Sequence, residues 1–166
     1  MESKLAHFII PVAGAFMTLR DRLEDDIKDS MRQRAQQRVD ALRFLKFAVQ
    51  AVEKERRETL DDDAMIQVVS KQVNDRRESV KAFRDGGRTE LADKEAFDLT
   101  VLEEYLPPQL SEEEITALVR RVVAEVGATG PRDRGKVMGR LMPQVRGKAD
   151  GAEVNRLAGE VLDSLG

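Results

Sequence analysis

The sequence of 166 residues contains no cysteine and no tryptophan, and it has one histidine, His7, and one tyrosine, Tyr105. Without cysteine the chain cannot form a disulfide, use a thiol nucleophile or bind a metal through thiolates. One histidine in an atypical leader segment cannot build a histidine-based metal site or a Ser-His-Asp triad. These absences remove several common catalytic centres. They are compatible with a reducing compartment, and we expect a cytoplasmic protein.

Aromatic residues are also scarce, at 4%, whereas charged residues make up 36% and apolar residues 41% of the chain. Domains rich in β-structure use more aromatic and β-branched residues. The observed mixture is typical of amphipathic helices with solvated outer faces. No segment of any length alternates apolar and polar residues, so no strand is assigned and the predicted fold class is all-α. The net charge of −3 requires any polyanion to bind at a local basic patch.

The first 16 residues do not follow the pattern of the rest of the chain. Segment 7–16 is apolar, but it contains Pro11 and is too short to span a membrane. Glu2 and Lys4 cancel the positive charge that precedes the apolar core of a signal peptide. We interpret residues 1–16 as a leader that is either disordered or the product of an upstream start, with Met17 as the true start, and we expect no membrane partner.

Helical spacing of apolar residues predicts about four helices in an N-terminal domain over residues 17–107. In the second of them, Leu42, Leu45, Val49 and Val52 form the buried face, and Phe44, Phe47 and Ala48 are interpreted as widening it. Capping residues and glycines indicate where these helices begin and end. The four helices are predicted after the Thr18–Asp21 capping box, from about Val39 to Glu58, from Asp61-Asp62-Asp63 to Gly86-Gly87, and from Thr89 to Leu106.

Pro107 and Pro108 predict the boundary between two domains, because the residue before a proline is pushed out of helical geometry. Residues 108–166 are predicted to form a small three-helix bundle. Its helices are expected from the Ser111–Glu114 capping box to Gly127, over Arg134–Met142 with Asp133 as cap and Pro143 as break, and from the Asp150 cap to an apolar stripe ending at Leu165.

Between Ala128 and Ala149 the chain has six basic residues and one acidic residue. Glycines interleave with them, where backbone can approach a partner closely, and Lys136 and Arg140 share a helix face. A protein binds a phosphate backbone through several cations and through exposed backbone amides, such as those at the start of a helix. The candidate RNA-binding residues are Arg132, Arg134, Lys136, Arg140, Arg146 and Lys148, with the motif glycines Gly135, Gly139, Gly147 and Gly151.

Other interpretations of these features remain. Residues 130–136 match the Gly-x-x-x-x-Gly-Lys of a phosphate loop, but Val137 replaces the Ser or Thr that would hold magnesium. A basic stretch is often only solvated surface. No serine lies in a Gly-x-Ser-x-Gly turn, and helix capping explains the acidic triplets, so no catalytic, cofactor-binding or metal-binding residue is assigned. A weaker second basic row, with acidic residues between its members, consists of Arg77, Lys81, Arg84 and Arg88.

The tail segment 133–143, Asp-Arg-Gly-Lys-Val-Met-Gly-Arg-Leu-Met-Pro, with 147–151 and Val154-Asn155, resembles the GatB/YqeY motif. Segments 42–46 and 105–111 resemble the stand-alone YqeY-like proteins, and the resemblance covers about residues 18–165. The tail is similar to the C-terminal domain of the B subunit of glutamine-dependent aspartyl/glutamyl-tRNA amidotransferase, a helical domain that engages tRNA.

This resemblance implies a helical N-terminal domain, a three-helix tail, and tRNA or other RNA as partner, with amidotransferase or tRNA-synthetase components as further partners. It also implies a family association with carbon–nitrogen ligase activity that uses glutamine as amide donor. The chain lacks both the kinase-like domain that would activate a carboxylate and an amidase. We therefore expect an RNA-binding accessory protein. The alternatives are a protein–protein adaptor and a true amidotransferase component, and the oligomeric state is open.

Overall fold

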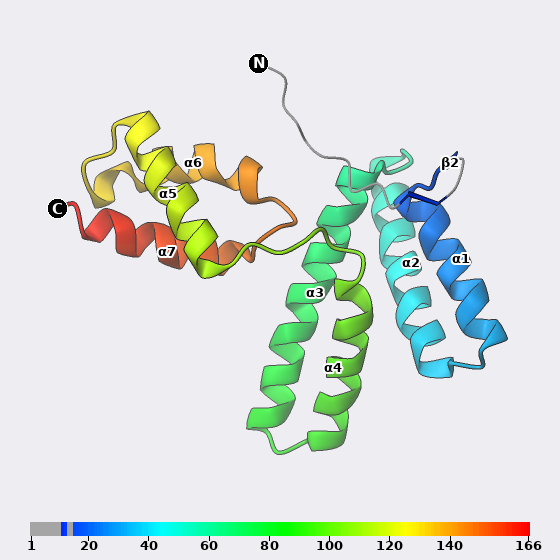
Figure 1. Ribbon diagram of the computed structural model, residues 1–166. Coiled ribbons are helices and arrows are strands. Elements are labelled where there is room, and N and C mark those ends of the chain that lie inside the picture. The colour runs from blue at the N-terminus through cyan, green and yellow to red at the C-terminus, as the bar shows by residue number, and fades with distance from the viewer. Residues whose placement is uncertain (1–10, 13–14) are drawn as a thin grey trace. The chain divides into compact units, whose positions relative to one another are not determined.

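The structure is a computed structural model that describes residues 11–12 and 15–166 (Figure 1). The predicted all-α fold, with four helices followed by three, is confirmed within this part of the chain. The helices are α1 (Leu19–Arg32), α2 (Gln36–Arg56), α3 (Asp62–Asp85), α4 (Thr89–Glu103), α5 (Glu112–Val126), α6 (Arg134–Val145) and α7 (Gly151–Asp163), with a 3₁₀ turn η1 (Pro131–Asp133) before α6.

Two strands of two residues each, β1 (Pro11–Val12) and β2 (Ala15–Phe16), pair antiparallel. They are too short to produce the alternation from which strands are predicted. The interpretation of residues 1–16 as a leader otherwise concerns residues 1–10 and 13–14, which lie outside the described residues. No helix in the described part of the chain is long and apolar enough to cross a membrane.

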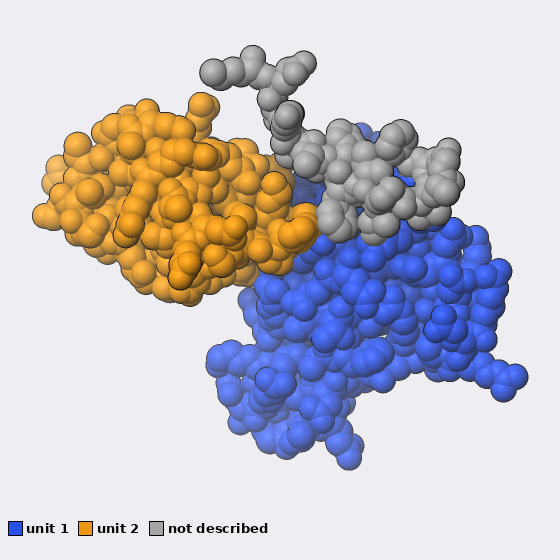
Figure 2. Space-filling view, viewed as in Figure 1, with its two compact units in different colours: residues 1–106 blue, residues 107–166 orange. Residues whose placement is uncertain are grey.

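The chain divides into two compact units, residues 1–106 and residues 107–166 (Figure 2). In the first unit α2 lies between α1 and α3, and α3 and α4 form a long helical hairpin (Figure 1). The core consists of aliphatic side chains from all four helices and is completed by Tyr105. Its most deeply buried members include Leu42, Leu45, Val69, Val73, Val101 and Leu102.

Local capping explains why these helices begin where they do. The predicted capping box of α1 is present: the Thr18 hydroxyl accepts from the Asp21 amide at 3.1 Å, and Asp21 Oδ2 accepts from the Thr18 amide at 3.3 Å. Asp61 caps α3 by accepting from the Ala64 amide at 2.8 Å. The fourth helix ends at Glu103 rather than at Leu106, because its last residues turn out of helical geometry before the two prolines.

The prediction that Phe44 and Phe47 widen the buried face of α2 is wrong. Their side chains are 48% and 66% exposed. The other helices cover only the side of α2 that carries Leu42, Leu45 and Val49, and the helical period turns the two phenylalanines away from it. Leu165, at the end of the predicted apolar stripe, is also 49% exposed.

The second unit packs α5, α6 and α7 around Ile115, Val119, Leu141 and Leu162. The predicted Ser111–Glu114 capping box, the left-handed Gly127 at the end of α5 and the Asp150 cap of α7 are all present. The predicted end and the predicted cap of α6 are both wrong.

Pro143 lies inside α6, which continues to Val145. A proline in the last turn removes one backbone hydrogen bond near a helix end, which is tolerated far better than a break in the middle. Asp133 makes no side-chain cap to α6. Its carboxylate instead accepts from the Thr129 amide at 2.8 Å, so that it closes the preceding loop.

Candidate nucleic-acid interface

Two candidate residues from the middle of the basic stretch, Lys136 and Arg140, lie on the outward face of α6. Val137, Leu141 and Val145 point into the core of the second unit and are fully buried. At 100° per residue, Lys136 and Arg140 lie on the opposite side of the helix, where both are exposed. The structure therefore places these two cations on one solvated face, as the i, i+4 spacing predicts.

Arg134 is engaged inside the unit. Its Nε donates to the Asn155 side-chain oxygen at 3.1 Å, and its Nη2 donates to that oxygen at 3.0 Å and to the Asn155 carbonyl at 2.8 Å. A Cβ atom built on the buried Gly159 would lie 3.2 Å from the Arg134 guanidinium, so the absence of a side chain there leaves room for it. These bonds join the start of α6 to α7.

Lys136 also has a partner within the unit. Its Nζ donates to the Val126 carbonyl at 2.6 Å. That carbonyl belongs to the last turn of α5, where carbonyl groups lack partners in the helix and lysine side chains commonly supply them. Lys136 thus ties α6 to the end of α5 while its charge remains at the surface.

The other four candidates make no internal side-chain contact of this kind. Arg132, Arg140 and Arg146 are exposed and Lys148 is half-buried. Within residues 17–166 their side chains have neither an ion-pair partner within 4 Å nor a hydrogen bond to another group. Their positive charges are therefore available to a ligand.

The nearby carboxylates are used elsewhere. Asp133 accepts from Thr129, and Asp150 Oδ1 accepts from the amides of Ala152 and Glu153 at 2.8 and 3.0 Å at the start of α7. Neither carboxylate forms an ion pair with the basic stretch within the described part of the chain. The surface keeps its local positive charge although the chain is negative overall.

The amides at the start of α6 are less available than the sequence suggests. The Asp133 amide donates to the Gly130 carbonyl at 3.0 Å, and the Arg134 amide donates to the Pro131 carbonyl. The turn η1 therefore satisfies amides that an isolated helix would leave free for an anion. The cationic side chains, rather than the helix start, are the main anion-attracting groups.

The four motif glycines have different structural roles. Gly147 has φ +74, a left-handed conformation that favours glycine, and its carbonyl accepts from Gln109 Nε2 at 2.8 Å. Gly151 leaves only ordinary contact distance to Met142. Gly135 and Gly139 lie on the exposed side of α6, and a Cβ at either would meet nothing within 4 Å. Nothing within the described residues explains glycine at these two helical positions.

The second basic row, on α3 and its exit, is partly neutralised. Arg77 pairs with Glu103 at 2.8 Å, and Lys81 pairs with Asp85 at 2.8 Å. The hydrogen bond to Asp85 raises the pKa of Lys81. This row is a weaker candidate for anion binding than the outward face of α6.

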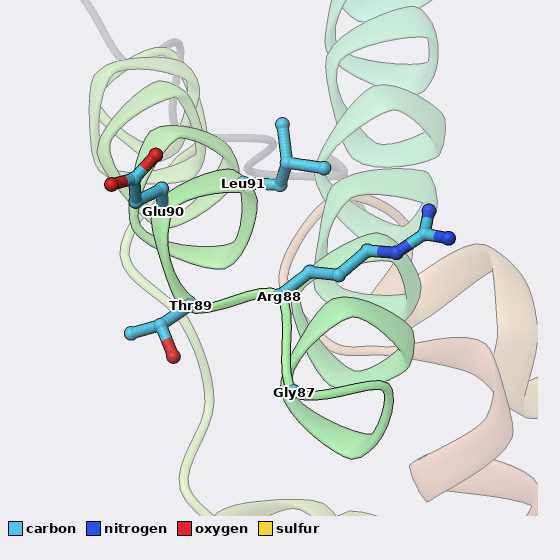
Figure 3. A pocket seen from close by; sticks show the side chains of 5 residues that line it. All are labelled: Gly87, Arg88, Thr89, Glu90 and Leu91. Carbon is cyan, nitrogen blue, oxygen red and sulfur yellow. The ribbon is translucent and has the colours of Figure 1, made fainter.

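A hollow of about 410 Å³ lies at the turn between α3 and α4 and is lined by residues 87–91 (Figure 3). In Figure 3 the Arg88 and Leu91 side chains point to one side of the turn, and Glu90 points to the other. The lining therefore offers no acid, base and nucleophile directed at a common point. Within the described residues no group of three or more metal-ligating side chains converges.

Sequence reasoning did not assign functions to two residues that shape this surface. Asn155 and Gly159 on α7 hold and accommodate Arg134. Asn155 is part of the motif, but its contact could not be found without knowing that α6 packs against α7. The two members of this pair are 21 positions apart in the sequence, so no local pattern reveals their contact.

The chain is similar to known proteins over most of its length. A family model described as "Yqey-like protein" matches residues 20–162. The chain is 30% identical over 144 residues to altered inheritance of mitochondria protein 41, mitochondrial, of Pyrenophora tritici-repentis, a match that covers 85% of this chain and 79% of that protein. It is 38% identical over 66 residues to a glutamyl-tRNA(Gln) amidotransferase subunit of Methanospirillum hungatei, covering 37% of this chain and 11% of that protein.

Proposed function

Since the chain belongs to the Yqey-like protein family, we propose that it is an RNA-binding accessory protein with tRNA as its preferred partner. The observation that carries the proposal is the outward face of α6 and its flanking loops, where four cations lack internal partners within the described residues. Clustered cations without neutralising carboxylates attract a phosphate backbone and release its counterions on binding. Similarity to a protein named as a tRNA amidotransferase subunit supports tRNA as the partner.

In this proposal the six basic residues divide into two roles. Arg132, Arg140, Arg146 and Lys148 contact phosphates directly. Arg134 and Lys136 hold α6 against α7 and α5 through the bonds to Asn155 and Val126, and they add their charge to the same surface. Phosphate contacts of this kind position an RNA without reading its sequence.

In this proposal the carbon–nitrogen ligase activity, with glutamine as amide donor, belongs to other proteins that the chain assists. The chain matches 11% of the length of the amidotransferase subunit from Methanospirillum hungatei, so the activity of that whole protein is not carried over. We propose that the chain assists amidotransferase or tRNA-synthetase components by engaging their tRNA. If adding the chain to a glutamine-dependent tRNA-amidation reaction leaves the rate unchanged, this part of the proposal is withdrawn.

Filter binding of tRNA to the full chain across a salt series tests RNA binding. We expect retention at low salt that weakens as salt rises. Arg140→Ala is expected to weaken binding and to reduce the slope of log K against log salt by about 1, as the loss of one phosphate contact predicts. Arg156→Ala in the same unit is the matched control, because Arg156 is already paired with Glu112 and Glu160. No retention of tRNA by the wild type at low salt removes the proposal.

A protein–protein adaptor is the second candidate function. The exposed Gly135 and Gly139 favour it, because helical glycines let the backbone of another element come close. A defined complex with amidotransferase components that survives nuclease and high salt supports the adaptor over the RNA-binding function. A complex that dissociates under both treatments supports RNA binding.

We propose the cytoplasm as the compartment, because a chain without cysteine is compatible with a reducing environment. One similar protein carries "mitochondrial" in its name, which makes the organelle the competing location. Fluorescent tagging at the C-terminus distinguishes the two, and exclusive organellar signal contradicts the proposal.

A further inference from the structure

Helix α2 has a second face that no described element covers. It consists of Asp40, Phe44, Phe47, Ala51 and Lys54, which follow one another at intervals of 4, 3, 4 and 3 residues, and all five are exposed. This is the spacing with which a helix presents one stripe to another helix. The opposite face, with Leu42, Leu45 and Val49, is already buried in the first unit.

The two aromatic rings make this stripe unlike an ordinary solvated surface. Phe47 is 66% exposed, the most exposed of the large apolar side chains in residues 17–166. Phe44 keeps 48% exposure although the Arg76 guanidinium lies 4.6 Å from its ring centre. At the α1 edge, the exposed Met31 extends the apolar surface and contacts Arg43 through its sulfur at 3.7 Å. Clustered aromatic, methionine and arginine side chains are typical of protein interfaces.

The order of residues in the stripe is complementary to itself. Asp40 lies seven residues before Phe47, and Lys54 lies seven residues after it. At 1.5 Å rise per residue, both are about 10 Å from the level of Phe47, in opposite directions. Two antiparallel copies of α2 with a two-fold axis at Phe47 therefore bring Asp40 of each copy level with Lys54 of the other.

The apolar residues fit the same arrangement. Phe44 lies three residues before the axis and Ala51 four residues after it, so the large ring of one copy meets the small side chain of the other. Phe47 faces its own equivalent. Alternation of large and small residues across the axis lets the two surfaces interdigitate.

The charged members of the stripe are free to pair in this way. Asp40 accepts a hydrogen bond from Gln36 at 2.7 Å but forms no ion pair in the part of the chain that the structure describes. Lys54 has no ion-pair partner within residues 17–166. A parallel arrangement would bring Asp40 to Asp40 and Lys54 to Lys54, and like charges in contact are destabilising.

We propose that the chain forms a homodimer in which α2 packs antiparallel on α2 of a second copy, with Phe47 at the two-fold axis. The partner is a second copy because the charge order of the stripe matches its own reverse. The same patch serves both copies, so the interface is isologous and closes at two chains. The dimer does not depend on RNA and is tested in its absence.

Sedimentation analysis of the full, nuclease-treated chain over a wide concentration range tests the proposal. We expect a mass of about twice the 18.7 kDa of one chain at the higher concentrations. Phe47→Asp is expected to give a single chain at all of them, and Leu91→Asp, at a 44% exposed position on α4, is expected to leave the dimer intact. Wild-type protein that stays a single chain throughout, or a dimer that survives Phe47→Asp, overturns the proposal.

Reversing the charges tests the antiparallel order. Asp40→Lys and Lys54→Asp are each expected to weaken the dimer at least tenfold, whereas the double variant is expected to restore it, because the reversed charges again meet their opposites. Neither position is buried, so circular dichroism should show unchanged helix content. A double variant no better than the single variants, or single variants that dimerise as the wild type does, overturns the two-fold axis at Phe47.

Discussion

The guanidinium of Arg134 and the side-chain oxygen of Asn155 are joined by two hydrogen bonds, of 3.1 and 3.0 Å, and a third from Arg134 reaches the Asn155 carbonyl at 2.8 Å. This pair connects α6 to α7 within the second unit. It also gives Arg134 a structural role at the edge of a surface where Arg132, Arg140, Arg146 and Lys148 have no side-chain partner within the described residues. The two roles can be separated by measuring stability and RNA binding on the same variants.

Arg134→Ala is expected to lower the free energy of unfolding by about 1–2 kcal/mol, because hydrogen bonds from a charged group are lost at an exposed site. Urea denaturation measures the change. Asn155→Ala is expected to cost about as much, and the double variant to cost less than the sum of the two. Additive losses would show that the two side chains do not stabilise the unit through each other.

Gly159→Ala tests the space beneath Arg134. The new Cβ would lie 3.2 Å from the guanidinium, so the arginine must shift by a few tenths of an ångström and its bonds to Asn155 weaken. We expect a loss of about 1 kcal/mol in the wild-type background and a smaller loss in Arg134→Ala, where the clash is absent. Equal losses in both backgrounds contradict this account.

Asp98 is expected to make the first unit less stable as pH rises. It is buried beside Arg76, with 3.2 Å between Asp98 Oδ2 and Arg76 Nη1, and burial raises its pKa above the ordinary value of 3.8 although the Arg76 charge opposes this. The folded state then binds the proton more readily than the unfolded state. The unfolding free energy therefore falls as pH rises from below 3.8 through the raised pKa.

The comparison that isolates this effect is the difference in unfolding free energy between the wild type and Asp98→Asn. As pH rises from below 3.8 through the raised pKa of Asp98, the unfolding free energy of the wild type is expected to fall relative to that of Asp98→Asn, since asparagine does not titrate. All other ionisable groups, including Glu95, which also pairs with Arg76, are present in both proteins. A difference that stays constant with pH contradicts a raised pKa for Asp98.

Tyr105 is 1% exposed and donates its hydroxyl hydrogen bond to Asp26, an arrangement that raises the pKa of the tyrosine well above its ordinary value of 10.0. Tyr105→Phe is expected to lower the unfolding free energy by about 1–2 kcal/mol at neutral pH, because Asp26 loses the Tyr105 hydrogen bond and keeps only the longer ion pair with Arg22, at 3.6 Å. Above pH 10 the unfolded tyrosine ionises first, so wild-type stability falls with pH, and this part of the alkaline loss should be absent in the variant.

The features that sequence reasoning predicted correctly are those decided within a few residues. The capping boxes at Thr18 and Ser111 and the cap at Asp150 are formed by groups two or three positions apart. Asp133 has the right residue type for a cap, but Thr129 in the preceding loop binds its carboxylate instead. A local pattern cannot decide between two local partners whose relative position depends on how the loop folds.

In the candidate surface, too, the sequence predicted what depends on nearby residues and missed what depends on how the helices pack. Helical spacing correctly places Lys136 and Arg140 on one side of α6. It cannot show that Lys136 binds the Val126 carbonyl, because that contact depends on how α6 packs against α5. It also misassigned Phe44 and Phe47, since a wide apolar stripe does not reveal which part of it the other helices cover. Those two residues are the centre of the proposed dimer contact.

Gly139 provides a prediction in which stability and binding move in opposite directions. It lies in the interior of α6 with open space where a Cβ would be, so Gly139→Ala is expected to raise the free energy of unfolding by about 0.5–1 kcal/mol. Gly147→Ala is the contrast, because φ +74 makes the same substitution destabilising there.

If a partner approaches the backbone of α6 closely, the added methyl of Gly139→Ala weakens tRNA retention in filter binding even though the protein is more stable. A loss of binding could not then be attributed to unfolding, which is the usual ambiguity of loss-of-function variants. Retention equal to that of the wild type would show that the bare backbone at this position is not used for RNA. The contact would then rest on the side chains of Arg132, Arg140, Arg146 and Lys148 alone, which the salt slope of the Arg140→Ala variant measures independently.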